Sequence, residues 1–213
     1  MLYLGMLSKA REKLAEQLFD IGAIKFGAFR LKLHEKKPDA PLSPIYIDLR
    51  LLRSFPSAMD LAIEVYMELI TGLKFDFLAD VPTAATPIAA ILSHRMKVPM
   101  VSPRKDEKGH GITGKINGVF ETGQTALLID DLITQAESKL EAISTLEANG
   151  LVVKDVVVLV DREQGGAEQL EAAGYKSYCA FKLSDLLQFY RQAGKIDRSQ
   201  YERTIVYLGS SPK

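Results

Sequence analysis

The middle of the chain, from about residue 74 to residue 182, alternates between short apolar runs and stretches with a helical period. The apolar runs predict strands at residues 75–80, 98–102, 125–130, 153–161 and 175–181. Helical patterns lie between most of these runs, at 87–96, at 137–148 before Asn149-Gly150, and after Gly166. This alternation predicts an α/β fold built from βαβ units, with a mostly parallel sheet covered by helices on both faces.

The two flanking regions carry the remaining predicted elements. Residues 6–20 have the period of an amphipathic helix, and residues 24–33 and 43–52 predict strands joined by an exposed hairpin loop at 34–41. Residues 57–73 predict a long helix capped by Ser57, and two helices finish the chain. We therefore expect a single domain over residues 1–213, with an N-terminal helix and strand pair in 1–55, the core sheet in 74–182 and C-terminal helices in 183–213.

Composition and charge narrow the classes of partner. Lys and Arg number 27, and so do Asp and Glu, so the formal net charge is zero. Nonspecific binding to nucleic acid or to a membrane surface needs a basic excess, and no apolar run reaches the roughly 18 residues of a membrane span. The single cysteine, Cys179, allows no intrachain disulfide, which favours a reducing compartment such as the cytoplasm. We therefore expect no nucleic-acid or membrane partner, and a charged N-terminus that begins a helix rather than a signal peptide.

Polar residues stand where four of the predicted strands end, at Asp80, Ser102, Asp130 and Asp161. In open parallel sheets, ligands bind outside the carboxyl ends of the strands. The loops that follow these four residues are therefore the candidate site.

The most informative of these strand ends carries two adjacent acids, Asp130 and Asp131. Neighbouring strand residues point to opposite faces of a sheet, so at least one carboxylate faces the crevice above the edge. Carboxylates accept hydrogen bonds from hydroxyl groups and bind divalent cations, while the N-terminus of the next helix favours a phosphate. Hydroxyl acceptors beside a phosphate site describe a ribose 5-phosphate. The alternative is that the two acids only cap the next helix.

Two further charged segments follow predicted strands. Residues 104–111 hold four basic side chains and two glycines, so this segment could close over a polyanion, or it could be a solvated turn. Residues 161–166 place Arg162 after a buried strand, where its guanidinium could pair with a planar carboxylate or imide. The glycines beside Arg162 allow close backbone approach, and the alternative for this segment is a surface turn.

Together these segments resemble the type I phosphoribosyltransferases, and within them the orotate phosphoribosyltransferases, including the form found in fused UMP synthases. The resemblance runs from about residue 14 to residue 190. The segments that carry it are LFDIGAIKFGAFRLK, SPIYIDLR, RKDEKGHG, LLIDDLIT, SKLEAI and VDREQGG. The acid pair is shared by all type I members, whereas DREQGG and SPIYIDLR are specific to the orotate branch.

The resemblance implies a five-stranded, mostly parallel sheet with a small N-terminal hood and a flexible loop, usually in a homodimer. It implies an enzyme of de novo UMP biosynthesis that transfers the phosphoribosyl group of phosphoribosyl pyrophosphate (PRPP) to orotate. The products would be orotidine 5′-monophosphate and pyrophosphate, and Mg²⁺ would bind together with PRPP. The protein itself would contribute no dedicated metal ligands.

The resemblance also implies roles for individual residues. Asp130 and Asp131 would hold the ribose hydroxyls and favour an oxocarbenium-like transition state. The loop that cradles the 5′-phosphate would be Thr134, Gln135, Ala136, Glu137 and Ser138. Pyrophosphate would be bound by a loop that reaches into the partner subunit's site and includes the catalytic Lys108: Arg104, Lys105, Lys108 and His110. The residues around orotate would be Lys32, Tyr46, Thr134 and Arg162.

The chain departs from the family pattern in three places. The phosphate loop usually reads Thr-Thr-Gly-x-Ser, so Ala136 replaces a glycine that could require a positive φ, and Glu137 brings a negative charge near the phosphate. Asp80 and Thr83 replace a glycine and a tyrosine in the turn that would contact pyrophosphate. The segment after Lys32 is longer than the family's tight turn, which puts the position of Lys32 in question.

These departures keep other functions open. The first alternative is a catalytically weak or inactive homologue that binds a nucleotide or PRPP as a regulator or partner subunit. The second is a phosphoribosyltransferase for a different base, against which DREQGG and SPIYIDLR argue. A nicotinamide-dependent oxidoreductase is remote because no G-x-G-x-x-G follows a predicted strand, and a zinc enzyme is remote because the three histidines and one cysteine lack ligand spacing.

Overall fold

The computed structural model describes residues 8–30, 33–36, 38–104 and 115–210. At its centre is a mixed six-stranded sheet with the order β5-β4-β3-β6-β7-β8. Only β5 runs antiparallel to its neighbour, β4; the other neighbouring strands are parallel. The strands are β3 (Phe77–Asp80), β4 (Met100–Pro103), β5 (Ile116–Asn117), β6 (Thr125–Ile133), β7 (Val152–Asp161) and β8 (Lys176–Lys182). The carboxyl ends of the five parallel strands therefore share one edge, where the predicted site loops begin.

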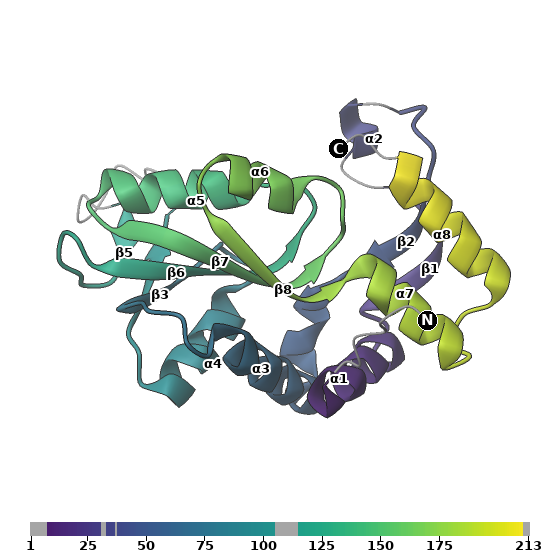
Figure 1. The fold of residues 1–213 in the computed structure, drawn as a ribbon, viewed down its shortest axis with the longest axis horizontal. Helices are drawn as coiled ribbons and strands as arrows, with labels where there is room; N and C mark the ends of the chain where they lie inside the picture. Colours follow the sequence, from purple (N-terminus) through teal and green to yellow (C-terminus); the bar gives the residue numbers. More distant parts are fainter. Residues whose placement is uncertain (1–7, 31–32, 37, 105–114, 211–213) are drawn as a thin grey trace.

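Helices cover both faces of this sheet (Figure 1), as its strongly apolar strands predict. On one face lie α5 (Glu137–Ala148) and α6 (Gly166–Ala172). On the other face lie α3 (Pro56–Ile70) and α4 (Thr86–Met96), and α1 (Lys9–Asp20) packs against α3. No helix in the described ranges is both long and apolar enough to cross a membrane.

A second, smaller sheet pairs the antiparallel strands β1 (Ile24–Phe29) and β2 (Ser43–Ile47). A short helix, α2 (Leu33–Lys36), lies between them in the sequence, and a 3₁₀ turn, η1 (Leu49–Ser54), follows β2. At the end of the chain, α7 (Leu183–Gln192) packs on β8, and α8 (Arg198–Ser210) packs against both α7 and β2. The C-terminal helix thus returns to the N-terminal sheet, on the side of the molecule seen at the right of Figure 1.

The fold class and the main βαβ units agree with the sequence-based expectation, and several local predictions are wrong. Ser57 is not the cap of α3: Phe55 occupies that position without a side-chain bond, and Pro56 begins the helix, where its fixed φ is suitable. Residues 49–52 form part of η1 rather than a strand, because the Asp48 side chain accepts a hydrogen bond from the Arg50 N–H and starts a turn.

The hairpin loop and the sheet also differ from the expectation. The segment predicted as an exposed loop contains α2, in which His34 is only 5% exposed. The sheet has a sixth strand, β5, of two residues, which is too short to leave a hydrophobic pattern. Strand β6 continues to Ile133, so Asp130 and Asp131 lie inside the strand, three and two residues before its end.

Candidate active site

The two acids of β6 face opposite sides of the sheet. Ala126 and Leu128 belong to the core beneath α5, whereas Leu127 and Ile129 belong to the core around α3. The same two-residue period places Asp130 on the α5 side and Asp131 on the α3 side, as the sequence predicts. Both side chains are buried, with 4% and 9% of their surface exposed.

Asp130 is held by a dense set of polar contacts. Its Oδ2 lies 2.5 Å from Nζ of Lys139, and its Oδ1 accepts a hydrogen bond from the backbone N–H of Asp131 at 2.9 Å. The same Lys139 ammonium donates to the carbonyl oxygen of Leu132 at 2.6 Å. The hydroxyl of Tyr66, on α3, donates to the carbonyl oxygen of Asp130 at 2.6 Å. Helices on both faces therefore fix this part of β6.

Among the described residues, the Asp131 carboxyl accepts one backbone hydrogen bond and interacts with the neighbouring Asp130 carboxyl. Its Oδ1 accepts a hydrogen bond from the Leu132 N–H at 2.8 Å. Burial, and then the negative charge of Asp130, raise the pKa of the Asp131 carboxyl to about 7. The hydrogen bonds and charge of Asp48, and more weakly the charge of Asp131, raise the pKa of Arg50, on η1.

Arg50 connects the acid pair to the N-terminal sheet. Its guanidinium bonds both carboxylate oxygens of Asp48, at 2.6 and 2.9 Å, and donates to the hydroxyl of Tyr46 at 3.4 Å. Tyr46 was predicted to lie beside orotate. The structure places it one hydrogen bond from a side chain that interacts with Asp131.

The loop after β6 has an ordinary backbone despite its unusual sequence. Ala136 is fully buried and caps α5 with φ −85° and ψ −4°, so this position does not require the positive φ that its missing glycine suggested. Its N–H donates to Oε1 of Gln169, on α6, at 2.9 Å. Glu137 is exposed, which removes it from the buried side of the loop. The first-turn N–H groups of α5 remain the natural anion donors of the loop.

The turn between β7 and α6 packs directly on this loop. The Arg162 N–H donates to the carbonyl oxygen of Ile133 at 2.9 Å. A methyl group on Gly166 would lie 2.8 Å from Cδ1 of Ile133 and 3.0 Å from the carbonyl oxygen of Thr134, so only glycine allows this approach. Glu163 has a φ of 57°, and its Oε2 accepts a hydrogen bond from the Ser184 N–H at the start of α7.

Arg162 is the most unusual side chain of the site. It is 6% exposed, and its buried Nε and Nη2 have no hydrogen-bond partner among the residues that the structure describes. Burial lowers the pKa of its guanidinium, and the nearby phenol of Tyr207, on α8, partly opposes this effect. A buried guanidinium with unused donors suits a planar anion such as a carboxylate.

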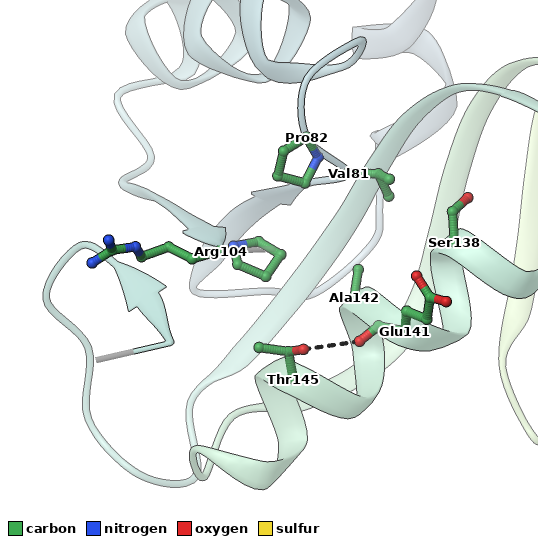
Figure 2. Close-up of a pocket in the computed structure, with 8 residues that line it drawn as sticks. Val81, Pro82, Arg104, Ser138, Glu141, Ala142 and Thr145 are labelled. Carbon is green, nitrogen blue, oxygen red and sulfur yellow. Dashed lines mark hydrogen bonds between the residues drawn. The ribbon is translucent and has the colours of Figure 1, made fainter. Parts of the chain in front are cut away.

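The strand ends on the other side of β6 form a small cavity of about 160 Å³. Figure 2 shows the turn after β3 and the end of β4 facing α5, with Arg104 and Ser138 both among the lining residues. The Arg104 side chain is exposed and points away from α5 in this view. Two residues predicted to bind PRPP, from segments far apart in the sequence, therefore border one cavity.

Asp80, a departure from the family pattern, keeps one buried oxygen, Oδ1, without a hydrogen-bond partner among the described residues. Its side chain is fully buried at the end of β3, and its Oδ2 accepts a hydrogen bond from the Thr86 hydroxyl. Thr86 begins α4, so the acid ties the strand to the helix after it.

Four predicted site residues lie outside the described ranges: Lys32, Lys105, Lys108 and His110. Of the predicted residues that the structure describes, Tyr46 lies on β2 of the small sheet, and the others lie at or near the carboxyl edge of the six-stranded sheet. Asp130, Asp131 and the 134–138 loop belong to one β6–α5 segment, and the Arg162 backbone is bonded to that segment.

Sequence reasoning missed the residues that support the acid pair and Arg162. The sequence does contain an indication for Lys139. A lysine in the first turn of a helix is unfavourable with the helix dipole, so a nearby acidic partner could have been predicted. Arg50 lies inside the SPIYIDLR segment but was given no role. Gln169 lies on α6, three residues after the VDREQGG segment, and Tyr207 lies on α8, far from the motifs in sequence; no local pattern indicates their contacts.

Comparisons with known proteins agree with this arrangement, although no family model matches the chain. The chain is 37% identical to the orotate phosphoribosyltransferase of Pyrobaculum aerophilum, over 91% of this chain and 96% of that protein. It is 35% identical to the bifunctional enzyme PyrF/PyrE of Nostoc sp. over 87% of its length, but it spans only 38% of that protein.

Solved structures give the same result. The UMP synthase of Leishmania donovani superposes with a TM-score of 0.83 and 37% identity, covering 94% of this chain and 42% of that one. The orotate phosphoribosyltransferase of Mycobacterium tuberculosis in complex with PRPP superposes with a TM-score of 0.65 and 25% identity, covering 85% and 93%. With its sheet, its acid pair and a relative matched over almost its full length, the chain belongs to the orotate phosphoribosyltransferase family.

Proposed function

We propose that this chain transfers the phosphoribosyl group of PRPP to orotate, giving orotidine 5′-monophosphate and pyrophosphate in UMP biosynthesis. The observation that carries the proposal is the position of Arg162. Its guanidinium is buried, has two unused donor atoms in the described structure and stands beside the strand that bears the acid pair. Orotate has both a carboxylate and an imide, which are the groups that a bidentate guanidinium recognises.

The phosphoribosyl half of the site would lie along β6 and α5. The 5′-phosphate would sit on the first-turn N–H groups of α5, within the 134–138 loop, where the helix dipole favours an anion. The ribose hydroxyls would face the acid pair. As the bond between ribose and pyrophosphate breaks, positive charge develops on the sugar ring, and a nearby carboxylate stabilises it.

The pyrophosphate would lie toward Arg104 and the cavity in Figure 2, together with Lys105, Lys108 and His110. Cations in this segment would neutralise the charge of the leaving group, which is the role proposed for Lys108 as a catalytic residue. In a homodimer, this segment would serve the site of the partner subunit. Lys32, Tyr46, Thr134 and Arg162 would surround orotate.

Mg²⁺ would arrive bound to PRPP. Within the described ranges, no group of three or more His, Cys, Asp or Glu side chains could hold a metal ion. Mg²⁺ commonly uses substrate phosphates with one or two carboxylates and water, so the acid pair and the pyrophosphate together suit it. When bound, the ion would neutralise developing charge on the pyrophosphate.

The structure shows the surroundings of the three residues that favoured a binding-only homologue. Ala136 has a relaxed backbone, Glu137 faces solvent, and Asp80 is bonded to Thr86. The relaxed backbone of Ala136 supports an active enzyme, since the loop keeps an ordinary conformation without the family's glycine.

A direct assay tests the proposal. Purified protein is mixed with orotate, PRPP and Mg²⁺, and the loss of orotate absorbance is followed, with each component omitted in turn. We expect turnover that needs all three, and none when uracil or adenine replaces orotate. A folded protein that binds PRPP without turnover would support the regulatory homologue instead, and turnover with another base would change the substrate.

Two variants test the assigned roles within the same assay. Asp131→Asn and Lys108→Ala should each reduce kcat on the order of 10²-fold or more, because each removes a charge that stabilises the transition state. Near-normal turnover in both variants would contradict these roles. Thermal unfolding of both proteins serves as the control for folding.

A further inference from the structure

Glu163 follows Arg162 directly in the sequence, yet its carboxylate is bonded elsewhere. Its Oε2 accepts a hydrogen bond from the backbone N–H of Ser184, at the start of α7, at 2.7 Å. The Nε and Nη2 atoms of Arg162 have no hydrogen-bond partner among the described residues. We propose that Glu163 is a positioning residue, which fixes the turn carrying Arg162 to the C-terminal helices and so holds the guanidinium in place for orotate. The part that concerns orotate rests on the proposed function.

The backbone of this turn is held in an uncommon conformation. Glu163 has a φ of 57°, in the left-handed region, which a residue with a side chain keeps only when its surroundings support it. The Glu163 N–H donates to Oδ1 of Asp161 at 2.8 Å, and the Arg162 N–H donates to the carbonyl oxygen of Ile133 at 2.9 Å. Two consecutive N–H groups of the turn are therefore bonded, and the Glu163 side chain adds a third connection.

The N-terminus of α7 receives its carboxylate from this distant residue. Lys182, which precedes the helix, has an extended backbone and makes no side-chain capping bond. The first N–H groups of a helix have no partner within it, and the helix dipole favours a negative charge at that end. Glu163, 21 residues earlier in the chain, supplies both an acceptor and the charge. The bond thus joins the Arg162 turn to a helix that local sequence does not connect to it.

The C-terminal helices also border the Arg162 side chain. Helix α7 packs on β8, and α8 packs against α7 and β2 (Figure 1). The phenol of Tyr207, on α8, lies near enough to the Arg162 guanidinium to oppose the lowering of its pKa by burial. Helix α7 therefore holds the backbone of the turn, and α8 stands beside the charge that the turn carries.

Other roles suit the Glu163 carboxylate less well. An ion pair with Arg162 would neutralise the guanidinium that the ligand needs, and a direct contact would repel the carboxylate of orotate. Glu163 lines a cavity of about 370 Å³ between α6 and β8, but the carboxylates of Glu168 and Glu171 also border it. That cavity is therefore unfavourable for an anionic ligand, and the bond to α7 remains the use that the geometry supports.

Two substitutions of Glu163 test the positioning role. Glu163→Ala should raise the KM for orotate about tenfold and leave kcat within about threefold of the wild type, since a small displacement of a binding group weakens its contact. Glu163→Gln keeps an oxygen that can accept the Ser184 N–H, so it should recover most of this loss. An unchanged KM in Glu163→Ala, or a Gln variant as impaired as the Ala variant, would overturn the proposal.

Lys97→Ala is the matched control. Lys97 ends α4 with a φ of 58° and is exposed, so this variant removes a side chain from the same backbone conformation on the other face of the sheet. It should leave the KM for orotate unchanged. An equal rise in KM would mean that the effect of Glu163→Ala does not come from its bond to α7.

A double-mutant cycle tests whether Glu163 acts through Arg162. In an Arg162→Met background, Glu163→Ala should change kcat/KM for orotate by less than about twofold, because the group that it positions is gone. A further loss as large as that in the wild-type background would show an independent contribution and would contradict the positioning role.

Amide hydrogen exchange tests the connection without substrate, so its failure can be told apart from failure of the proposed function. Glu163→Ala should speed exchange in two segments, 162–166 and 183–187, because the bond between them is lost. Faster exchange at 183–187 alone would overturn the connection even in a protein that turns over orotate. Faster exchange in both segments of a protein without turnover would support the connection and refute only the proposed function.

Discussion

Two buried cations, Lys139 and Arg162, lie near the carboxyl edge of the sheet, and they differ in whether the described chain provides a partner for their charge. Lys139 is 4% exposed and is paired with Asp130, whereas Arg162 is 6% exposed and keeps Nε and Nη2 unpartnered within the described residues. The first cation is satisfied once the chain has folded. The second has no anionic partner among the described residues, so in the proposed function a ligand would offset its desolvation cost. We therefore interpret Lys139 as a charge that orders the protein itself and Arg162 as a charge available to a ligand.

The same distinction explains the two halves of the site. On the side proposed for the phosphoribosyl group, hydrogen bonds from Lys139 and Tyr66 to backbone carbonyl oxygens, and from a backbone N–H to Gln169, fix the backbone. On the proposed base side, the buried Arg162 guanidinium has no partner for Nε and Nη2 among the described residues, so we expect the ligand to supply one. A site prepared in this way strengthens a charge-assisted hydrogen bond with the incoming anion, since the local dielectric is low.

The largest effect is expected when the Arg162 guanidinium is removed. Arg162→Met should lower kcat/KM for orotate by about 10²–10³-fold through KM, because two charge-assisted hydrogen bonds are lost. Its Tm should stay level or rise, since an unpaired buried charge is removed, in contrast to the loss expected for Lys139→Met. Steady-state kinetics and thermal unfolding measure both quantities.

Arg162→Lys is the matched control for this variant. It keeps the charge but loses the planar fork, so it should recover only part of the orotate affinity. A marked fall in Tm for Arg162→Met would indicate that the guanidinium has a structural partner, and the contrast with Lys139 would then disappear.

The next largest effect is expected where the turn that carries Arg162 packs on the loop after β6, at Gly166. Gly166→Ala should destabilise the protein by about 1–3 kcal/mol, because the new methyl group would overlap Ile133 and press on the Thr134 carbonyl. It should also raise the KM for orotate, since the turn that carries Arg162 must move. Denaturant unfolding measures the first effect. Gly209→Ala, at a helical position with nothing within 4 Å, should be neutral or slightly stabilising.

The acid pair predicts a pH dependence of stability. The pKa of Asp131 is raised to about 7 in the folded chain, so folding takes up a proton between its ordinary value of 3.8 and about 7. This contribution is fully present below pH 3.8 and is lost as the pH rises through 7. We expect it to remove roughly 1–2 kcal/mol of unfolding free energy between pH 5 and 7.

Denaturant titrations of wild type and Asp131→Asn over this pH range isolate that contribution, because the variant lacks the carboxyl. The difference in unfolding free energy between the two proteins should change with pH in the direction given. Parallel curves would mean that Asp131 titrates at its ordinary pKa, and the effect of burial and of Asp130 on it would be contradicted.

The smallest effect concerns a charge at the same edge that is neither buried nor paired in the described structure. Glu137 is exposed, so Glu137→Gln should change stability by less than about 0.5 kcal/mol and the KM for PRPP by less than about twofold. Steady-state kinetics at low and high salt measure this. A large fall in KM that salt abolishes would show that the carboxylate does face the phosphate.

Most of the fold follows from local patterns, and the exceptions have identifiable causes. The apolar run of β7 and the helical period of α5, with Asn149-Gly150 after it, predict those elements almost to the residue. By contrast, β5 has two residues and exists only through pairing with β4, and α2 gives no periodic signal in four residues. Elements this short are decided by tertiary contacts.

The candidate site divides in the same way. The acid pair, the 134–138 loop and Arg162 were predicted because their chemistry and their family motifs lie in continuous segments. Arg50, Lys139, Gln169 and Tyr207 were missed, since each acts on a residue from another element. Whether Ala136 needs a positive φ could not be predicted from the sequence, and the structure gives it a φ of −85°.

The sequence by itself determined the α/β class, the order of its units and the chemical groups at the strand ends, because strand and helix periods and charged motifs are local properties. Tertiary structure alone decided which charges are satisfied. Whether Asp130 finds Lys139, and whether Arg162 finds an acid, depends on how helices pack on opposite faces of the sheet. Burial makes that outcome decisive, since a charge removed from water must have a partner in the chain or in a ligand.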